Sequence, residues 1–125
     1  MILGLGIDFL ETRRVERELS RSQWLTESGI FTPGEINYCS SARRPARRYA
    51  ACFTAKEAAL KALGVQVRDL AIFREVEVEA VSDREHRLLL HERLKAESAK
   101  LGVRHVKLSI AHKAGQVAAV VVLEA

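Results

Sequence analysis

The sequence lacks the features of a disulfide-rich secreted protein, a zinc-binding domain or a membrane-spanning protein. Its 125 residues contain only two cysteines, Cys39 and Cys52, and no C-x-x-C pair. Two cysteines cannot build a disulfide framework, and no histidine stands at zinc-ligand spacing from them, so both are expected to be free thiols. No apolar run approaches the ~20 residues of a membrane-spanning helix. These absences favour a protein held together by its own hydrophobic core.

Proline, glycine and low-complexity tracts are too scarce to divide the chain. It holds two prolines and seven glycines, with 48% apolar and 29% charged residues. This is the composition of an ordinary globular protein, and the length suits one hydrophobic core. Residues 1–125 are therefore expected to form a single domain. The N-terminal segment MILGLGIDFLE lacks the basic start and long apolar region of a signal peptide, which predicts a cytoplasmic location.

Positive charge is in excess and is concentrated in two arginine-rich segments. The formal net charge is +4, which favours anionic partners without choosing among them. The first segment carries Arg13, Arg14, Arg17 and Arg21, and the second carries Arg43, Arg44, Arg47 and Arg48. The first forms a helical stripe suited to an acidic protein or a nucleic-acid backbone. The second is the better phosphate candidate, because it leads directly into a charged helix.

The first half of the chain predicts one strand followed by helices. Residues 2–8 are apolar and β-compatible, and they end at an acid. The helices that follow have cap and stop signals in the sequence. These signals are Thr12 as the cap of a helix through residue 25, a Thr32–Pro33–Glu35 capping box, and a helix from Pro45 to Leu63 that Gly64 ends.

A strand and a further helix are predicted next. Residues 74–81 alternate charged and apolar side chains, the pattern of a strand with one wet face. Residues 82–102 have helical spacing of apolar side chains, with Ser82 or Asp83 as the cap and Gly102 as the stop.

The C-terminal segment predicts a β-hairpin. Two β-rich runs, residues 106–112 and 115–124, are joined around Lys113, Ala114 and Gly115. Strand, helices, strand, helix and hairpin together predict an α+β domain, with a largely antiparallel sheet packed against helices.

Two acids interrupt apolar surroundings: Asp8 closes the first strand and Glu57 lies in an alanine-rich helix. Such a pair suits Mg²⁺, which takes few protein carboxylates and fills its other positions with water and phosphate oxygens. The plainer alternative is that Asp8 caps a turn and Glu57 is solvated. Lys61 follows Glu57 by one helical turn, so it forms either a surface ion pair or a positive charge beside a metal-bound phosphate.

Two other motifs give only weak evidence for a catalytic or nucleotide-binding site. His112 ends the run VKLSIAH, with Ser109 three residues before it. A hydrolase triad with Asp8 is conceivable, but no G-x-S-x-G elbow surrounds the serine. Gly4 and Gly6 lack the third glycine of a dinucleotide-binding loop, so that fingerprint is not supported.

Four segments in this order resemble the holo-acyl-carrier-protein synthase family of 4′-phosphopantetheinyl transferases. They are GLGIDFLETRRV at 4–15, FTPGEINYC at 31–39, RRYAACFTAKEAALKALG at 47–64 and KLSIAH at 107–112. The resemblance implies the α+β fold of that family. It also implies Mg²⁺-dependent transfer of the phosphopantetheine arm of coenzyme A to a serine of apo acyl carrier protein, with release of adenosine 3′,5′-bisphosphate.

The resemblance implies a role for each matching residue. Asp8 and Glu57 would hold Mg²⁺ on the pyrophosphate, and Glu57 and Lys61 would be catalytic. The base that deprotonates the serine is either Glu57 or a metal-bound water. The coenzyme-binding positions would be Arg47, Lys56, Lys61, Gly64, Ser109 and His112.

The resemblance also implies partners. The basic stripe of Arg13, Arg14, Arg17 and Arg21 would face the acidic carrier protein, with Arg14 the strongest candidate. That carrier protein could belong to fatty-acid or polyketide synthesis. Family members of this length are homotrimers with three sites at subunit boundaries, so a homotrimer is expected.

The sequence departs from the family pattern near the coenzyme. Val65 stands where the family has the threonine of a Thr-Gly pair, Cys52 replaces an arginine, and Ala111 replaces a serine or threonine. A Gly-Lys-Pro loop is absent between Val81 and Leu88. Because the metal-binding acids and the following lysine are retained, an active enzyme with an altered coenzyme pocket is favoured.

Two alternatives remain open at this point. One is a non-catalytic or specialised relative that binds carrier protein or coenzyme A without transfer. The other is a basic nucleic-acid-binding domain. The second is weaker, because aromatic residues are not interleaved with the arginines and no base-reading motif is present.

Overall fold

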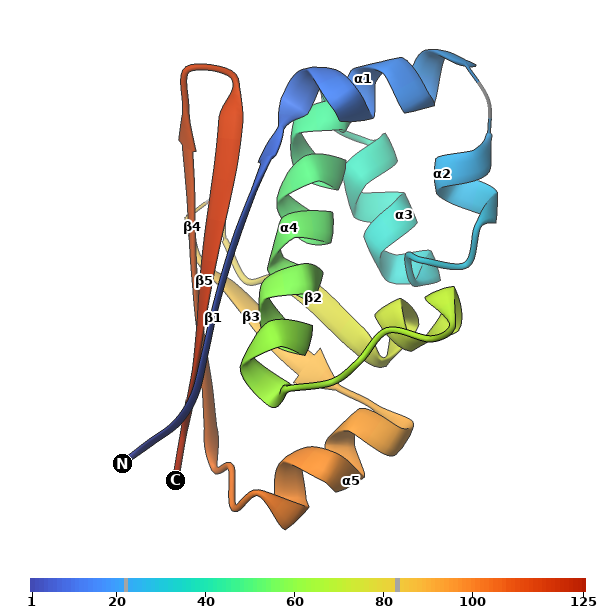
Figure 1. Ribbon diagram of the computed structural model, residues 1–125. Coiled ribbons are helices and arrows are strands. Elements are labelled where there is room, and N and C mark those ends of the chain that lie inside the picture. Colours follow the sequence, from blue (N-terminus) through green and yellow to red (C-terminus); the bar gives the residue numbers. More distant parts are fainter. Residues whose placement is uncertain (22, 83) are drawn as a thin grey trace.

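A three-stranded antiparallel sheet carries the fold. Its strand order is β1–β5–β4, formed by β1 (Ile2–Glu11), β5 (Gln116–Glu124) and β4 (His105–Lys113). The computed structural model describes residues 1–21, 23–82 and 84–125. Both chain ends lie at the same end of this sheet, beside the ends of β1 and β5 (Figure 1). A second antiparallel sheet pairs β2 (Val76–Ala80) with β3 (His86–Leu90).

The helices cover one face of the three-stranded sheet (Figure 1). They are α1 (Thr12–Arg21), α2 (Trp24–Glu27), α3 (Pro33–Ser40), α4 (Pro45–Leu63), the 3₁₀ helix η1 (Leu70–Glu75) and α5 (Glu92–Lys100). The long helix α4 packs directly against β1 and β5, and α1, α3 and β2 pack against α4. Among the described residues, no helix is both long and apolar enough to cross a membrane.

Two glycines let β1 lie directly on α4. A Cβ atom at Gly4 would collide with the carbonyl oxygen of Ala62, and one at Gly6 would collide with that of Ala58. The facing side of α4 is rich in small residues, and Ala58 is completely buried. Strand and helix therefore meet at backbone distance, which explains the G-x-G pattern of the N-terminal strand.

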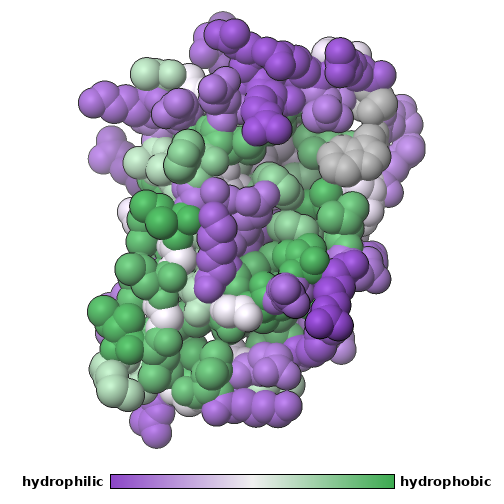
Figure 2. All heavy atoms as spheres, in the orientation of Figure 1, coloured by the Kyte–Doolittle hydropathy of each residue, from purple (hydrophilic) through white to green (hydrophobic). Residues whose placement is uncertain are grey.

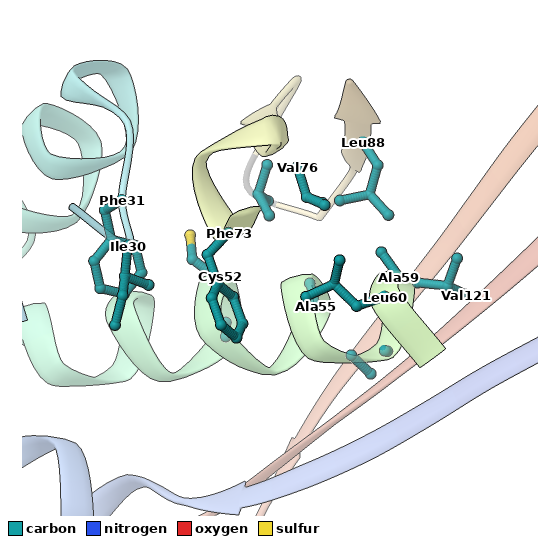
Figure 3. Packing of buried hydrophobic residues seen from close by; sticks show 14 of the residues in the cluster. Ile30, Phe31, Cys52, Ala55, Ala59, Leu60, Phe73, Val76, Leu88 and Val121 are labelled. Carbon is teal, nitrogen blue, oxygen red and sulfur yellow. The ribbon is translucent and has the colours of Figure 1, made fainter. Parts of the chain in front are cut away.

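The hydrophobic core includes the inner face of β5 and continues on the side of α4 away from β1. Figure 3 shows Phe31, Phe73 and Leu88 on the side of α4 that faces away from β1. Phe31 meets Tyr49 edge-to-face with ring centroids 5.0 Å apart, and Phe53 stacks on Phe73 at 5.4 Å. These aromatic pairs join α4 to the segment before α3 and to η1.

A buried ion pair connects α4 to α3 and β2. Lys56 is completely buried, and its Nζ lies 2.6 Å from Oε1 of Glu35. Nζ also donates hydrogen bonds to the carbonyl oxygens of Ile30 at 3.0 Å and Phe73 at 2.8 Å. The other carboxylate oxygen of Glu35 accepts the N–H of Val78 at 2.7 Å. Both charges are thus paired and hydrogen-bonded, as burial requires.

The outer face of the three-stranded sheet is uncovered and apolar. Leu5, Ile7 and Phe9 of β1 are 64%, 61% and 71% exposed. Across the sheet they pair with residues of β5 whose side chains lie on the same face, among them Val120 and Val122. Figure 2 shows apolar side chains gathered at the left, over this sheet. Exposed apolar side chains packed this closely mark an interaction surface.

Most local signals are confirmed. The capping box is formed, because Thr32 Oγ1 accepts the N–H of Glu35 at 3.2 Å and Glu35 Oε1 accepts the N–H of Thr32 at 2.8 Å. The helix α4 has the predicted bounds, and Gly64 ends it with a left-handed φ of 68°. The hairpin turns at Ala114 and Gly115, both with positive φ. The expected α+β class with antiparallel pairing is also confirmed, although the strands form two sheets.

The helix predicted over residues 82–102 is wrong in its first half. Residues 86–90 form β3, in which Leu88 pairs with Val78 of β2. Ser82 Oγ accepts the N–H groups of Arg84 and Glu85 and so closes a turn, and the alternative cap, Asp83, lies outside the described residues. Pairing with β2 overrides the helical spacing here, and only α5 is helical.

The first strand, expected over residues 2–8 with Asp8 at its end, continues to Glu11, so Asp8 lies within β1. Boundaries of two other elements also differ from the prediction. The first helix, expected through residue 25, ends at Arg21, and α2 begins separately at Trp24. The strand expected over 74–81 begins at Val76, because η1 occupies the residues before it. Gly102, with φ 83°, ends α5 as predicted.

Replacing Gly6 by alanine is expected to lower the free energy of unfolding by about 3 kcal/mol, because the added methyl group overpacks the contact between β1 and α4. Chemical denaturation followed by circular dichroism measures this change. Ser109→Ala on β4, an exposed position, serves as the control and should change the free energy by less than about 0.5 kcal/mol. Equally small effects of both substitutions would contradict the close approach.

Candidate active site

The contact between β1 and α4 brings two carboxylates and one ammonium together. Lys61 Nζ lies 3.3 Å from Oδ1 of Asp8 and also donates to the carbonyl oxygen of Ile7 at 3.3 Å. Asp8 Oδ1 accepts the N–H of Phe9 at 2.9 Å. Glu57, one helical turn before Lys61, lies close enough to Asp8 for each carboxyl group to shift the pKa of the other. The side chain of Asp8 is only 16% exposed and that of Lys61 is 56% exposed, so the acids are sheltered while the lysine reaches solvent.

The surroundings shift the pKa values of the two carboxylates in opposite directions. Burial, the hydrogen bond with Asp8 and the negative charge of Asp8 raise the pKa of Glu57 to about 7, although Lys61 and Arg14 act in the opposite direction. Burial also opposes ionisation of Asp8, but the bonds with Glu57, the N–H of Phe9 and Lys61 outweigh it and lower the pKa of Asp8. Two neighbouring acids whose pKa values are pushed apart lose their protons in separate steps, Asp8 before Glu57.

This pair has the chemistry of a Mg²⁺ site. Among the described residues, no group of three or more His, Cys, Asp or Glu side chains could hold a metal ion. Asp8 and Glu57 supply hard oxygen ligands from two adjacent carboxylates, and Mg²⁺ often needs no more from a protein. A cation between them would favour the charged form of both carboxylates. The donor set therefore fits an ion that keeps water and phosphate oxygens as its other ligands.

A cleft of about 800 Å³ opens next to the acid pair. Its charged residues are Asp8, Glu57, Arg14 and Glu18, and its apolar wall includes Phe53. The cleft lies between β1, α1 and α4, so it can receive a flexible ligand beside the acids. Arg14 stands on its rim, exposed on α1.

Basic side chains gather in two adjoining hollows near the start of α4. One, of about 510 Å³, is lined by Arg43, Arg44, Arg47, Arg48, His86 and His112 among others. The other, of about 690 Å³, shares Arg44, Arg47 and His112 and adds Arg13 and Lys113. Burial and then the charge of Arg47 lower the pKa of His112, and burial with Arg48 lowers that of His86. The larger hollow also contains Glu11 and Glu16, whereas no acid is among the residues that line the smaller one. The basic donors of the smaller hollow favour a phosphate-bearing ligand.

The structure brings some predicted site residues together and separates others. Asp8, Glu57 and Lys61 form one cluster, and Arg47 and His112 meet in the basic hollows. Gly64 ends α4, two residues beyond the last alanine that contacts β1. Arg13, Arg14, Arg17 and Arg21 are all exposed on α1, where Val15 is the buried position.

The coenzyme-binding prediction for Lys56 is corrected. Its ammonium is completely buried and is engaged by Glu35, Ile30 and Phe73, so it cannot reach a ligand. Ser109 is also placed apart from His112. The two lie three residues apart on β4 and therefore project from opposite faces of the sheet, with Ser109 on the outer face opposite Val120.

Sequence reasoning missed His86 as a member of the basic hollow. This histidine was read as part of a helix, and only its place on β3 turns it toward Arg48 and His112. Arg43, Arg44 and Arg48 belong to the segment that the sequence predicts to bind phosphate, because arginines are concentrated there. No local signal pointed to the histidine.

Comparison with known proteins gives a consistent result. A family model of the 4′-phosphopantetheinyl transferase superfamily matches residues 4–121. The chain is 40% identical to a holo-[acyl-carrier-protein] synthase from Geobacter sp. (strain M21) and 39% identical to one from Solibacter usitatus (strain Ellin6076), each over 99% of both chains.

Solved structures agree with these relatives. The fold matches the crystal structure of the holo-[acyl-carrier-protein] synthase from Neisseria meningitidis with a TM-score of 0.86 and 28% identity, over 100% of both chains. It matches the Bacillus anthracis str. Ames synthase in complex with CoA (3′,5′-ADP) with a TM-score of 0.74 and 30% identity, over 98% of this chain and 96% of that one.

Lys56→Met is expected to lower the free energy of unfolding by about 3 to 5 kcal/mol, because it leaves the buried carboxylate of Glu35 without its partner. The matched control is Lys61→Met, which should change it by less than about 1 kcal/mol because that side chain is mostly exposed. Urea denaturation measures both. A Lys56→Met variant that is as stable as the parent chain but fails to bind coenzyme A would restore the original prediction.

Proposed function

The chain belongs to the 4′-phosphopantetheinyl transferase superfamily, and we propose that it transfers the phosphopantetheine arm of coenzyme A to a serine hydroxyl of an apo acyl carrier protein. The observation that carries this proposal is the cluster of Asp8, Glu57 and Lys61 at a cleft. It occurs in a chain that matches holo-[acyl-carrier-protein] synthases along its whole length.

Each member of the cluster has a separate task in this proposal. Asp8 and Glu57 would hold Mg²⁺, which when bound neutralises charge on the pyrophosphate oxygens and polarises the phosphorus. The serine oxygen forms a bond to that phosphorus, and the bond to the bridging pyrophosphate oxygen breaks. Lys61, exposed beside Asp8, would stabilise the negative charge that develops on the departing adenosine 3′,5′-bisphosphate.

The proton of the serine hydroxyl also needs an acceptor. Glu57 is one candidate, because its carboxylate lines the cleft beside Asp8. A water held by the acid pair is the alternative base. Either acceptor lies at the cleft, so the carrier serine would enter there.

The basic hollows would hold the other end of coenzyme A. Arg47 and His112 line both hollows, and their donors suit the 3′-phosphate of the nucleotide. Arg47 lies ten residues before Glu57 on α4, which is about 15 Å along the helix axis. The phosphate-binding arginines and the acid pair thus occupy separate places on one rigid element.

Of the departures from the family pattern, Cys52 is the one that lines the smaller basic hollow. Ala111 is exposed, and like Ser109 it projects from the outer face of the sheet. The loss of an arginine at position 52 is offset by four other arginines around the same hollow. This distribution supports an active enzyme with an altered pocket over a relative that has lost the site.

The exposed face of α1 would receive the carrier protein. Arg14 lies at the rim of the cleft, and Arg13, Arg17 and Arg21 are exposed on the same helix. Opposite charges on the two partners would steer association and fix the register of the complex. An acidic carrier protein docked here would present its serine to the acid pair.

We infer that the chain assembles as a homotrimer. The uncovered apolar face of β1, β5 and β4 supports this, because Leu5, Ile7 and Phe9 are more than half exposed in one copy. A second copy of the same chain is the occupant that would bury this face, and sites at the subunit boundaries would then bring Ser109 near a neighbouring copy. A cytoplasmic location and a role in lipid synthesis remain predictions that belong with this proposal.

Incubation with apo acyl carrier protein, coenzyme A and Mg²⁺ should increase the intact mass of the carrier protein by one phosphopantetheine arm, and EDTA should prevent the increase. Asp8→Asn and Glu57→Gln should each lower kcat/KM by at least about 100-fold, because they remove a ligand and a charge at the reacting phosphorus. Mass spectrometry over time measures the rate.

Glu97→Gln on the exposed surface of α5 is the matched control and should transfer normally. Near-normal turnover of either site variant, with Mg²⁺ as the only metal, would refute the metal assignment. Coenzyme A binding without transfer would favour a non-catalytic relative, and strongly salt-dependent DNA or RNA binding would favour the nucleic-acid alternative.

Ile7→Glu should convert the trimer to monomers, because it places a charge in the middle of the apolar sheet face. Size-exclusion chromatography with light scattering measures the mass in solution. Leu101→Glu is the control, since Leu101 is 49% exposed but lies after α5, away from the sheet face. A parent chain that is already monomeric at micromolar concentration would overturn the assembly.

A further inference from the structure

Two buried thiols meet where α3 packs against α4. Cys39 near the end of α3 and Cys52 in the middle of α4 have their sulfur atoms 3.6 Å apart. Both are reduced, and they are 0% and 2% exposed. Cys52 lines the smaller basic hollow, but no step of the proposed transfer uses either thiol.

The two helices are held firmly around the thiols. Ser40 and Tyr49 hydrogen-bond through their hydroxyls at 2.6 Å, and Arg48 Nη1 donates to the carbonyl oxygen of Tyr38 at 2.8 Å. The guanidinium of Arg48 also lies 4.0 Å from the centre of the Tyr38 ring. These contacts flank the cysteines on both helices, so the sulfur atoms are kept in contact.

Cys52 borders a solvent-accessible hollow. Cys52 belongs to the lining of the 510 Å³ basic hollow, together with Arg47, Arg48 and His112, whereas Cys39 is not part of that lining. Figure 3 shows the sulfur of Cys52 projecting from α4 on the side away from β1. A small uncharged oxidant that enters the hollow would therefore meet Cys52 first.

We propose that Cys39 and Cys52 form a dithiol that a hydroperoxide oxidises to a disulfide, and that this oxidation weakens ligand binding in the adjoining basic hollow. In the first step the sulfur of Cys52 attacks one peroxide oxygen, the O–O bond breaks, and Cys52 becomes a sulfenic acid while water or an alcohol leaves. In the second step the sulfur of Cys39 attacks that of Cys52, and the sulfenic oxygen leaves as water. Two thiols are oxidised and one peroxide is reduced.

The surroundings of the two cysteines slow the first oxidation step and favour the disulfide over sulfinic acid as the product. The hydrogen bond with Cys39 and then burial raise the pKa of Cys52, so the reactive thiolate is scarce at neutral pH. Once a sulfenic acid forms, the neighbouring thiol is already in contact with it. Closure to the disulfide therefore precedes further oxidation to sulfinic acid.

Formation of the disulfide would change the wall of the basic hollow. A disulfide bond is about 2.0 Å long, so the sulfur of Cys52 must move toward Cys39 and away from its present position in the wall. Arg48 lies one turn earlier on the same face of α4 and contacts Tyr38, the residue before Cys39. A ligand that contacts the wall of the hollow in its reduced form would be bound more weakly after oxidation. By thermodynamic linkage, the same bound ligand would disfavour oxidation of the two thiols.

The first test treats the reduced full-length protein with hydrogen peroxide and follows its intact mass and peptide map. The parent chain should lose the mass of two hydrogen atoms and yield a peptide that links Cys39 to Cys52 within one molecule. Cys39→Ala should instead gain oxygen on Cys52, and Cys52→Ala should stay unmodified because its remaining thiol is shielded. Two free thiols in the treated parent chain, or a link between two molecules, would overturn the proposal.

The second test measures the coupling with adenosine 3′,5′-bisphosphate, which has no thiol of its own. The ligand should slow disulfide formation at least about five-fold, and the oxidised chain should bind it more weakly by a similar factor. Dithiothreitol should restore binding, and peroxide-treated Cys52→Ala should bind as its untreated form does. A disulfide that leaves the affinity unchanged would overturn the coupling.

This inference rests on the proposed function only for the identity of the ligand. The transferase assay on fully reduced protein tests that function separately. A chain that transfers phosphopantetheine but forms no disulfide would therefore refute the dithiol alone.

Discussion

The close approach of β1 to α4 is the constraint on which the candidate site depends. At Gly4 and Gly6 any side chain would collide with carbonyl oxygens of α4, so the strand lies directly on the helix. Asp8 follows on the same face of the strand and is thereby placed beside Glu57 and Lys61. The glycine pattern, which resembles a fragment of a nucleotide-binding loop, serves packing instead, and packing in turn assembles the charged cluster.

The opposite side of α4 is held by the buried pair of Lys56 and Glu35. Such a pair adds less to stability than its attraction suggests, because both groups lose their water on burial. Its hydrogen bonds to Ile30, Phe73 and Val78 instead tie α4 to three other segments. With β1 on one side and this network on the other, α4 is fixed in rotation. Two adjacent residues of α4 therefore lie in different surroundings. Lys56 places its ammonium in the core, and Glu57 places its carboxylate at the cleft.

Local signals in the sequence predicted the parts of the fold that local forces decide. The capping box of Thr32 and Glu35, the stop at Gly64 and the hairpin turn at Gly115 each depend on a few neighbouring residues, and each is confirmed. Residues 86–90 were misread because their helical spacing competes with pairing to β2, which is distant in the sequence. His86 was not predicted as a site residue for the same reason. Lys56 was wrongly assigned to the coenzyme site, because the sequence shows that a residue is charged but not whether its side chain is buried.

By itself, the sequence determined the α+β class, the bounds of the longest helix and the acids and lysine that carry the proposed chemistry. These depend on residue types and short spacings, and the four segments that resemble the transferase family are of that kind. Only the tertiary structure decided which charged side chains meet, which one is buried, and which face of the sheet is left uncovered. Residues 8 and 57 come together, and Cys39 reaches Cys52, because elements far apart in the chain pack face to face. That packing depends on the shapes of whole surfaces, which no local pattern records.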